Sequence, residues 1–553
     1  MPRPQPFFLE VDLASGISEF AGGDRHERFA EPLADHEDER TRWSVAGLVL
    51  DVAEGGLGSN AELAHAARHD LPALLRRLRG TFSGALCDRE RGAWHVFVDQ
   101  IGSRSLFYYA DERRAIVSSS IAAVADRMRA RGLAAKTDRH GAYSLLTYGW
   151  CVDDLTLVEG IRPLRAGRIL TIAPGTRGVR ERAYYRLPEA GTFPGTFPEA
   201  TVELEARFAQ AIRRAFERER TAGLTPVVTL SGGLDSRMTA LASLAAGYRE
   251  QLNLTFANTG SLDERTPRRI AADYGLEWLY KSLDGGDYLL ALERVTPLLE
   301  GRVAVQGAAH AYELLRRLAW GGLGLLHTGQ NGDVVVGRAV TRTPPPRFLG
   351  VGASDRRLLG RLADYRPDVA HASAEHYLFA NRFFRGNGSS LAALQRFTET
   401  YSPFTDVDVL DLCLSLPPDF RARHRLYRAW IARHHPAADA YVWSQTRARP
   451  TARGVRWGEH RYHLPQVWDR FADALPVIGK RRASRRKMVP LDRYYATNAR
   501  LRDYLDGYLG GHLDLLDDPT LRADAEALYR GGSTGNRLQV VSLLAAVKYL
   551  GGS

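Results

Sequence analysis

The sequence predicts an α/β protein built from two domains. Residues 186–200 contain three prolines and two glycines with little periodicity, which is typical of a linker. Upstream of this linker the pattern is mostly short strands, whereas downstream of it apolar strands alternate with helices. That alternation favours a parallel sheet covered by helices. We therefore expect one domain over 1–190 and a second over 200–553, which becomes largely helical after about residue 390.

Two runs in the first domain predict strands, WHVFV at 94–98 and LFYY at 106–109. In the second domain, apolar runs predict buried strands, and the segments between them carry helical spacing. The expected strands are 225–230, 252–256 and 323–328, and the expected helices are 236–246 and 264–274.

Composition narrows the class of protein. The chain has 553 residues, of which 44% are hydrophobic and 25% are charged, as in ordinary globular proteins. No run approaches the about 18 consecutive apolar residues of a membrane helix, and the first residues lack an apolar signal segment. The cysteines, Cys87, Cys151 and Cys413, are too far apart for a zinc pattern or a disulfide framework. We expect a cytoplasmic protein that does not bind membranes.

The basic charge of the chain is almost all arginine. The net charge is +11, and only five of the 75 basic residues are lysines. Arginine suits bidentate binding of phosphate or carboxylate, although a GC-rich genome would also favour it. Because no nucleic-acid recognition module is visible, we expect an acidic or phosphorylated small partner and no nucleic acid. Residues 480–487 hold six positive charges, which predict either a solvated loop or a clamp for phosphate or an acidic peptide.

The strongest motif is a glycine loop between a predicted strand and a predicted helix. Adjacent glycines bring backbone N–H groups close to an anion, and the helix that follows presents its unpaired donors and positive dipole end. An aspartate at this place can hold Mg²⁺ against phosphate oxygens. The sequence therefore predicts an ATP site formed by Ser231, Gly232, Gly233, Leu234, Asp235 and Ser236.

A second polar loop follows the strand predicted at 323–328. It contains Gly329, Gln330, Asn331, Gly332 and Asp333. Because parallel strands end at one edge of a sheet, we expect both loops to meet there. Asp235 and Asp333 are then the candidate magnesium ligands.

The first loop, SGGLDS, resembles the pyrophosphate loop of ATP pyrophosphatases, and both loops together resemble the asparagine synthetase family. The second loop has Val334 where the family usually has an acid. Phe256 and Asn258 lie where the family binds the nucleotide, and ETYSPFTD at 399–406 resembles its ExRxPFLD segment. The resemblance implies a C-terminal adenylating domain with a parallel sheet, ATP and Mg²⁺.

The N-terminal part resembles the family's class II glutaminase domain, an N-terminal-nucleophile fold with αββα layers. LRGTF at 78–82 and DQIGSRSLFYY at 99–109 carry this resemblance. Such glutaminases use a cysteine directly after the initiator Met, but residue 2 is Pro2. Cys87 lies within a strand-like run and favours a buried structural role. We therefore expect a degenerate domain that serves as a structural platform.

An intact ATP loop without a glutaminase nucleophile resembles two branches of the superfamily, β-lactam synthetases and lasso peptide cyclases. Chain length and the GQNGD variant favour the cyclases. The resemblance implies a precursor core peptide as substrate, with a leader-binding protein and a leader peptidase as pathway partners. Ammonia-dependent asparagine synthesis and a non-catalytic scaffold are the remaining alternatives.

The resemblance also implies catalytic residues. Glu399 matches the position of a catalytic glutamate from a Tyr–Glu pair, with Tyr365 or Tyr377 as its partner, and a surface or ion-paired carboxylate is the alternative for Glu399. Arg449 and the nearby Arg447 match a basic position that faces pyrophosphate, and a solvated surface is the alternative for both.

Overall fold

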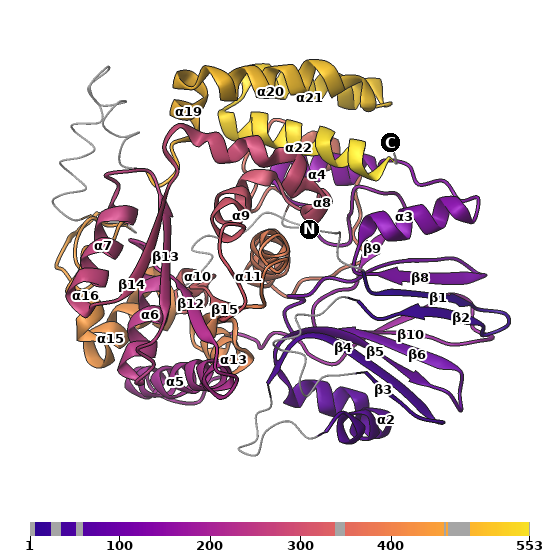
Figure 1. Cartoon of the computed structure of the whole chain (residues 1–553), viewed down its shortest axis with the longest axis horizontal. Coiled ribbons are helices and arrows are strands. Elements are labelled where there is room, and N and C mark those ends of the chain that lie inside the picture. Colours follow the sequence, from indigo (N-terminus) through magenta and orange to yellow (C-terminus); the bar gives the residue numbers. More distant parts are fainter. Residues whose placement is uncertain are drawn as a thin grey trace.

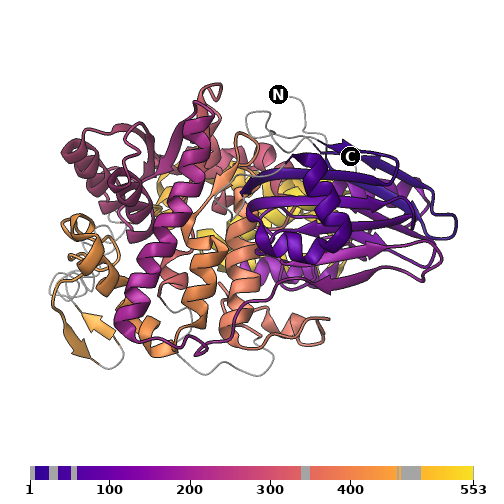
Figure 2. The ribbon, with the colours of Figure 1, turned by 90° about the horizontal axis from the view of Figure 1, so that it is seen from below.

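The computed structural model describes residues 6–23, 35–50, 59–337, 349–457, 460–462 and 487–551. An N-terminal β-sandwich and a second domain with a parallel sheet lie side by side (Figures 1 and 2). Long C-terminal helices run across both of them (Figure 1).

The N-terminal domain alternates antiparallel strands with three described helices. Its strands are β1 (Phe8–Asp12), β2 (Ser18–Ala21), β3 (His36–Glu37), β4 (Thr41–Leu50), β5 (Arg79–Asp88), β6 (Ala93–Val98), β7 (Phe107–Ala110), β8 (Arg114–Ser118), β9 (Arg162–Pro163), β10 (Arg168–Ile172) and β11 (Arg180–Ala183). Its helices are α2 (Asn60–Arg77), α3 (Ile121–Ala130) and α4 (Arg139–Tyr148).

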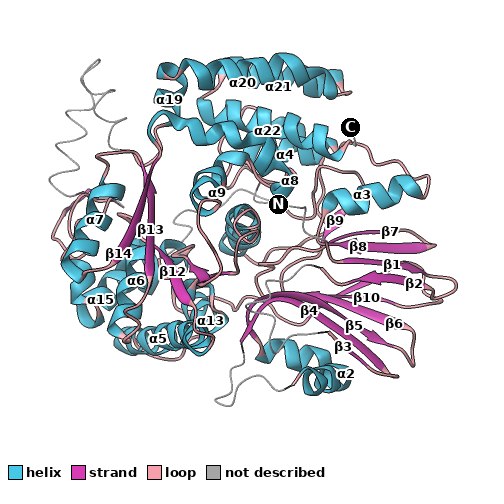
Figure 3. Ribbon diagram, in the orientation of Figure 1, coloured by secondary structure: helices cyan, strands magenta, loops and turns pink. Residues whose placement is uncertain are grey.

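These strands form two facing sheets, in the orders β2-β1-β8-β7-β9 and β11-β10-β6-β5-β4-β3. Apolar side chains from both sheets, among them Leu9, Val96 and Val117, share one core between them. Helix α2 buries Leu71 and Leu75 against the outer face of the second sheet, and α3 covers the first. The expected αββα layers are therefore present (Figure 3).

The second domain begins with α5 after the proline-rich segment. Its strands are β12 (Thr225–Thr229), β13 (Leu252–Ala257), β14 (Glu277–Ser282), β15 (Leu323–His327), β16 (Thr400–Tyr401), β17 (Val455–Trp457) and β18 (His460–Tyr462). Its α-helices are α5 (Phe197–Thr221), α6 (Leu234–Ala245), α7 (Leu262–Tyr274), α8 (Leu292–Leu299), α9 (Ala309–Leu315), α10 (Gly332–Val335), α11 (Ala374–Leu378), α12 (Gly388–Leu391), α13 (Val407–Ser415), α14 (Pro418–Arg421), α15 (Arg425–His434), α16 (Pro436–Asp439), α19 (Leu491–Thr497), α20 (Ala499–His512), α21 (Pro519–Gly531) and α22 (Thr534–Leu550).

Shorter helical turns join these elements. They are η1 (Asp284–Ala291), η2 (Val305–Gly307), η4 (Leu359–Leu362), η6 (Pro403–Thr405), η7 (Ala422–His424) and η8 (Leu513–Leu515). A further segment, η5 (Phe379–Asn387), is a π-helix of nine residues. Because π-helical segments are rare and often occur at functional sites, η5 marks a place to inspect.

The parallel sheet has the order β14-β13-β12-β15-β16. The chain runs from β12 outward to β14 and then returns to the other side of β12 through β15. The strand order therefore reverses between β12 and β15, and ligands of such sheets bind beyond the carboxyl ends of the strands at this reversal. Both polar loops of the sequence follow these two strands.

The two domains share a core through the C-terminal helices. Leu543 and Leu544 of α22 pack in one apolar cluster with Val124 of α3 and Leu145 of α4. The last fifty residues thus cover elements of both domains, an arrangement that the linear domain boundary did not predict. No helix in the described ranges is long and apolar enough to span a membrane.

Candidate active site

The first loop is a tight turn whose own side chains fix its backbone. Ser231 N–H donates to Ser236 Oγ at 2.9 Å, the two serine hydroxyls lie 2.7 Å apart, and Gly233 N–H donates to Ser231 Oγ at 3.2 Å. Gly233 caps α6 without a side chain, so a side-chain acceptor does not occupy the first amides of that helix. The loop therefore leaves helix N–H groups directed beyond the sheet edge.

Glycines allow the second loop to lie against the first. A Cβ on Gly329 would come 2.2 Å from Ser236 N, and one on Gly332 would come 2.7 Å from Asp235 Cγ. Asn331, between them, adopts a left-handed conformation with φ of 66°. The predicted meeting of the two loops is thus confirmed, and it depends on glycine at both contacts.

Asp235 joins the two loops. Its Oδ2 accepts from Asp333 N–H at 3.0 Å, and its Oδ1 accepts from the hydroxyl of Tyr427 at 2.8 Å. Burial, reinforced by the negative charge of Asp333, raises the pKa of Asp235 to about 8. The neighbouring carboxylates of Asp235 and Asp333 could hold a cation between them, because a bound positive charge would favour the ionised form of both.

The buried arginine of α6 holds a third segment over the first loop. Arg237 donates to the carbonyls of Ala438, Tyr441 and Val442, and also to that of Gly232 at 3.2 Å. Next along the chain, Ser444 N–H donates to Gly232 O at 2.9 Å. The turn at 443–448 therefore lies directly on the glycine loop.

The two candidate nucleotide-binding residues, Phe256 and Asn258, lie at the carboxyl end of β13, the strand next to β12. Phe256 packs edge-on against His310, with ring centroids 4.7 Å apart. Asn258 N–H donates to Met488 O at 2.9 Å, and its side-chain oxygen accepts from Tyr494 OH at 3.4 Å. The structure thus places Phe256 and Asn258 at the carboxyl edge of the sheet, one strand away from the first loop.

The donor set fits a nucleotide triphosphate with Mg²⁺. A Cβ on Gly233 would meet only Ser231 Oγ at 3.2 Å, so this side of the loop is open to a ligand. The described residues contain no group of three or more His, Cys, Asp or Glu side chains placed to hold a metal ion. Mg²⁺ commonly binds through one or two carboxylates, waters and substrate phosphates, which is what Asp235 and Asp333 can offer.

The structure separates Glu399 from these loops. Glu399 is 1% exposed and accepts from the guanidinium of Arg104 in the N-terminal domain. Ser402 contacts the second loop through Gln330. Glu399 lies three residues before Ser402, which is about 10 Å along an extended strand. The other carboxylate oxygen of Glu399 has no hydrogen-bond partner among the described residues.

Neither candidate tyrosine forms its hydrogen bond with Glu399. Tyr365 OH donates to Asp154, and Tyr377 OH donates to the hydroxyl of Tyr148. Burial raises the pKa of both phenols. The Tyr–Glu pair inferred from the sequence is therefore not assembled here, because Tyr377 bonds to the last residue of α4 and Tyr365 bonds to the segment that follows α4.

The structure describes the candidate arginines at 447 and 449, but it does not describe most of the basic run. Arg449 is exposed just after the 443–448 turn, and Arg447 within the turn has φ of 58°. Of the basic run at 480–487, residues 480–486 fall outside the described ranges.

Sequence reasoning missed several side chains that complete the site. Tyr427 contacts Asp235, Ser402 Oγ donates to Gln330 O at 3.0 Å, and Asn387 Nδ2 donates to Asn331 Oδ1 at 3.0 Å. Burial lowers the pKa of His424, the negative charge of Asp333 partly offsets this effect, and its buried Nδ1 has no partner among the described residues. Of these residues, Ser402 lies in the segment at 399–406 that resembles the family, so this segment could have indicated it.

The cysteines are all free and buried. Burial raises the pKa of the Cys87 thiol, and raises the pKa of Cys151 to about 12. Since the thiolate is the nucleophile, neither side chain is suited to attack glutamine.

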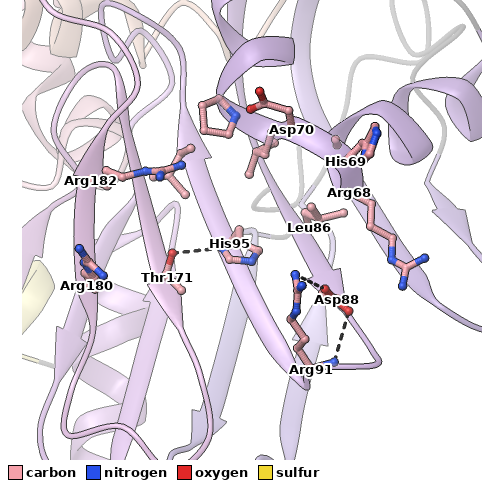
Figure 4. A pocket seen from close by; sticks show the side chains of 14 residues that line it. Arg68, His69, Asp70, Leu86, Asp88, Arg91, His95, Thr171, Arg180 and Arg182 are labelled. Carbon is pink, nitrogen blue, oxygen red and sulfur yellow. Dashed lines mark hydrogen bonds and ion pairs between the residues drawn. The ribbon is translucent and has the colours of Figure 1, made fainter.

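A cavity of about 370 Å³ lies between α2 and the second sheet of the N-terminal domain, and no residue of the two loops lines it (Figure 4). Its arginines Arg68 and Arg91 already pair with Glu90 and Asp88.

Comparisons with known proteins agree with this architecture. Residues 60–185 match the family model of a glutamine amidotransferase domain, and residues 204–438 match that of asparagine synthase. The protein named Amidase chry2 from Gibberella zeae is 28% identical over 169 residues, which are 30% of this chain. The match spans only 23% of that relative's length.

Two solved structures were also found. They are an allosteric regulatory enzyme of purine biosynthesis and the glutamine phosphoribosylpyrophosphate amidotransferase from B. subtilis in complex with ADP and GMP. Each is 12% identical and covers 50% of this chain, with 74% and 59% of the other chain covered and TM-scores of 0.21 and 0.20.

The family models divide the chain at the same place as its architecture. The sandwich carries the amidotransferase match, and the parallel sheet with its two loops lies within the synthase match up to residue 438. The N-terminal domain therefore resembles a glutamine amidotransferase domain, and the second domain resembles asparagine synthase over residues 204–438.

Proposed function

We propose that the chain is an ATP-dependent lasso peptide cyclase. It activates the side-chain carboxylate of an Asp or Glu in a precursor core peptide as an acyl-AMP and then forms a macrolactam with the N-terminal amine of the same peptide. AMP and pyrophosphate are released. The observation that carries the proposal is the SGGLDS loop, joined to the second polar loop through Asp235, beside an amidotransferase-like domain whose cysteines are buried.

The loops supply binding and electrostatic stabilisation. Backbone amides at the start of α6 face the position of the phosphates, and such fixed donors stabilise developing charge without reorganising. Asp235 and Asp333 would hold Mg²⁺, which offsets the charge of the phosphates when it is bound. Tyr427 and the Gly332 contact orient the Asp235 carboxylate.

The amine must come from the substrate. Ammonia from glutamine requires a nucleophilic cysteine, and burial raises the pKa of both Cys87 and Cys151. A peptide that carries both the amine and the acid needs no second nitrogen source. A leader-binding protein and a leader peptidase are the partners that this reaction class would require to deliver such a peptide.

A product assay tests the proposal. The purified chain is incubated with ATP, Mg²⁺ and linear peptides that have an N-terminal Gly and an internal Asp or Glu, and nucleotide and peptide are followed together by mass spectrometry. The expected result is AMP with a peptide that has lost one water and resists aminopeptidase. The same peptides with an acetylated N-terminus are the control and should not cyclise.

Other outcomes point elsewhere. AMP formation only with small β-amino acids would support a β-lactam synthetase-like amide synthetase. AMP formation with aspartate and ammonia would support asparagine synthesis, and bound ATP without any turnover would support a scaffold. Each of these results contradicts the cyclase.

A further inference from the structure

A cavity of about 290 Å³ lies between the two domains. Its walls come from the segments 100–107 and 163–168 of the N-terminal domain and from 369–389 of the second domain, which includes η5. None of the residues of the two ATP loops lines it. The cavity is therefore a separate feature from the candidate active site.

Positive charge dominates the lining. Five arginines line the cavity, against the two acidic residues Asp153 and Glu189. Of these arginines, Arg302 is only 8% exposed and Arg385 is partly buried. Buried charges in proteins are normally paired with an opposite charge, so this pair calls for an explanation.

Neither guanidinium forms an ion pair within the described residues. Arg302 donates to the carbonyls of Leu298 and Leu299 at 2.8 and 3.0 Å, and Arg385 donates to those of Asp153 and Leu155. These contacts leave Arg302 Nη1 and Arg385 Nε without an acceptor in the part of the chain that is described. Burial lowers the pKa of both groups; for Arg302 the negative charge of Glu300 opposes this effect and the positive charge of Arg385 adds to it.

The nearby carboxylate is already engaged. Asp153 Oδ1 accepts from His371 Nε2 at 2.8 Å and from Asn381 Nδ2 at 2.9 Å. The charges of Asp153 and Asp154 offset part of the positive field around Arg385, and that of Glu300 does so for Arg302, but within the described residues neither arginine has a bidentate carboxylate partner. A carboxylate ligand would supply one, because the guanidinium fork matches two carboxylate oxygens.

Part of the wall is apolar, and the volume limits the size of the ligand. Phe107, Leu164, Ala380 and Phe384 contribute hydrocarbon surface, and Arg302 itself stacks on the Phe107 ring at 5.4 Å. The volume is at the lower end of the about 300–1,000 Å³ typical of ligand pockets. The arginines, the apolar part of the wall and the volume together suit a small acid with an apolar body rather than a long peptide.

One element, η5, contacts both the cavity and the second loop. The inner side of η5 lines the cavity with Ala380, Asn381 and Arg385, and the last residue of η5, Asn387, bonds to Asn331 at 3.0 Å. A ligand in the cavity therefore contacts the same π-helix that supports the loop at 329–333.

We propose that this interdomain cavity binds a small organic carboxylate with an apolar body, held between Arg302 and Arg385. The carboxylate belongs either to a free acid or to the C-terminus of a short peptide. The apolar part lies against Phe107 and Phe384. This site is independent of the proposed cyclisation and does not require nucleotide.

The test is binding to the full-length protein without ATP. Titration calorimetry and thermal unfolding are measured with hexanoate, with the neutral hexanamide of equal size, and with acetyl-phenylalanine in its free-acid and amide forms. We expect at least one free acid to bind saturably and to raise the melting temperature, and its amide to bind at least about tenfold more weakly. The better of the two acids identifies the source of the carboxylate.

Variants locate the site. Arg302→Gln and Arg385→Gln should each weaken acid binding about tenfold or more. Ala380→Phe should abolish it by filling the cavity, and this variant leaves both arginines in place if either arginine variant does not fold. Arg182→Gln, in the cavity of Figure 4, is the matched control and should bind like the wild type.

Three results would overturn the proposal. One is the absence of saturable binding by either acid. Another is equal binding of acid and amide. The last is acid binding that survives in Ala380→Phe. Because nucleotide turnover is not measured, a failure here is distinguishable from a failure of the proposed cyclase.

Discussion

The carboxylate of Asp235 is held from two directions, by the hydroxyl of Tyr427 and by the amide of Asp333. Asp235→Asn retains the shape and an acceptor but removes the charge that a cation needs. We expect AMP formation to fall more than about 100-fold, since even outer-shell changes at metal sites cost 10–100-fold. Exposed Asp503→Asn is the control, and AMP formation at the wild-type rate in Asp235→Asn would remove the magnesium assignment.

Tyr427 offers a subtler change at the same carboxylate. Tyr427→Phe removes one hydroxyl from a buried position and leaves the ring in place. We expect kcat/KM for AMP formation to fall about 10–100-fold, while stability changes by about 1 kcal/mol. Tyr441→Phe, whose hydroxyl bonds to Asp273 outside the loops, should leave the kinetics unchanged. Equal kinetics in both variants would show that Tyr427 does not orient Asp235.

Strands and helices could largely be predicted from the sequence, because their signal is local. The runs at 225–230, 252–256 and 323–328 correspond to β12, β13 and β15, and the glycine loop begins α6 as expected. The short β16 could not be found this way, since two residues carry no period and its pairing with β15 arises only in the folded chain. The same limit applies to the partners of Glu399, which lie 295 residues away in the case of Arg104.

The contact between the two loops is a property of elements and depends on small residues. Gly329→Ala places a methyl group against the start of α6, where a Cβ would come 2.2 Å from Ser236 N. We expect a loss of about 1–3 kcal/mol in the free energy of unfolding, with loss of ATP binding. Gly321→Ala, which meets nothing within 4 Å, is the control. Unchanged ATP affinity in Gly329→Ala would mean that the loops move independently.

Helix α5 and strand β15 are joined by a fully buried pair. Glu219 and His327 are both 0% exposed, their side chains lie 2.5 Å apart, and Glu219 also accepts from Leu325 N–H at 2.6 Å. Glu219→Ala leaves His327 and this amide without their partner. We expect the free energy of unfolding to drop by about 3–5 kcal/mol in urea titrations, against less than about 0.5 kcal/mol for the exposed Glu203→Ala. A similar small change in both would show that the pair contributes nothing to the sheet.

At the scale of the whole molecule, the amidotransferase domain is part of the core of the protein. Side chains of α3, α4 and α22 form one cluster, so a chain that begins after residue 190 would expose its apolar surface. We expect such a truncation to be insoluble or without cooperative unfolding by circular dichroism, whereas the full chain unfolds in one transition. A folded, monomeric truncation would show that the two domains are separable.

The two domains also meet through a buried ion pair between Arg104 and Glu399. If Glu399 acts mainly through this pair, then Glu399→Gln and Arg104→Gln should each destabilise the protein by about 3 kcal/mol, because each leaves a buried partner unmatched. The double variant should then be less destabilised than the sum of the two single variants, which a double-mutant cycle in urea measures directly. We expect this coupling, and we expect both single variants to affect adenylation and amide formation alike.

The alternative is that the Glu399 oxygen without a partner among the described residues accepts the proton of the attacking amine. In that case Glu399→Gln would slow amide formation far more than adenylation while Arg104→Gln would not, and this asymmetry would contradict the purely structural role.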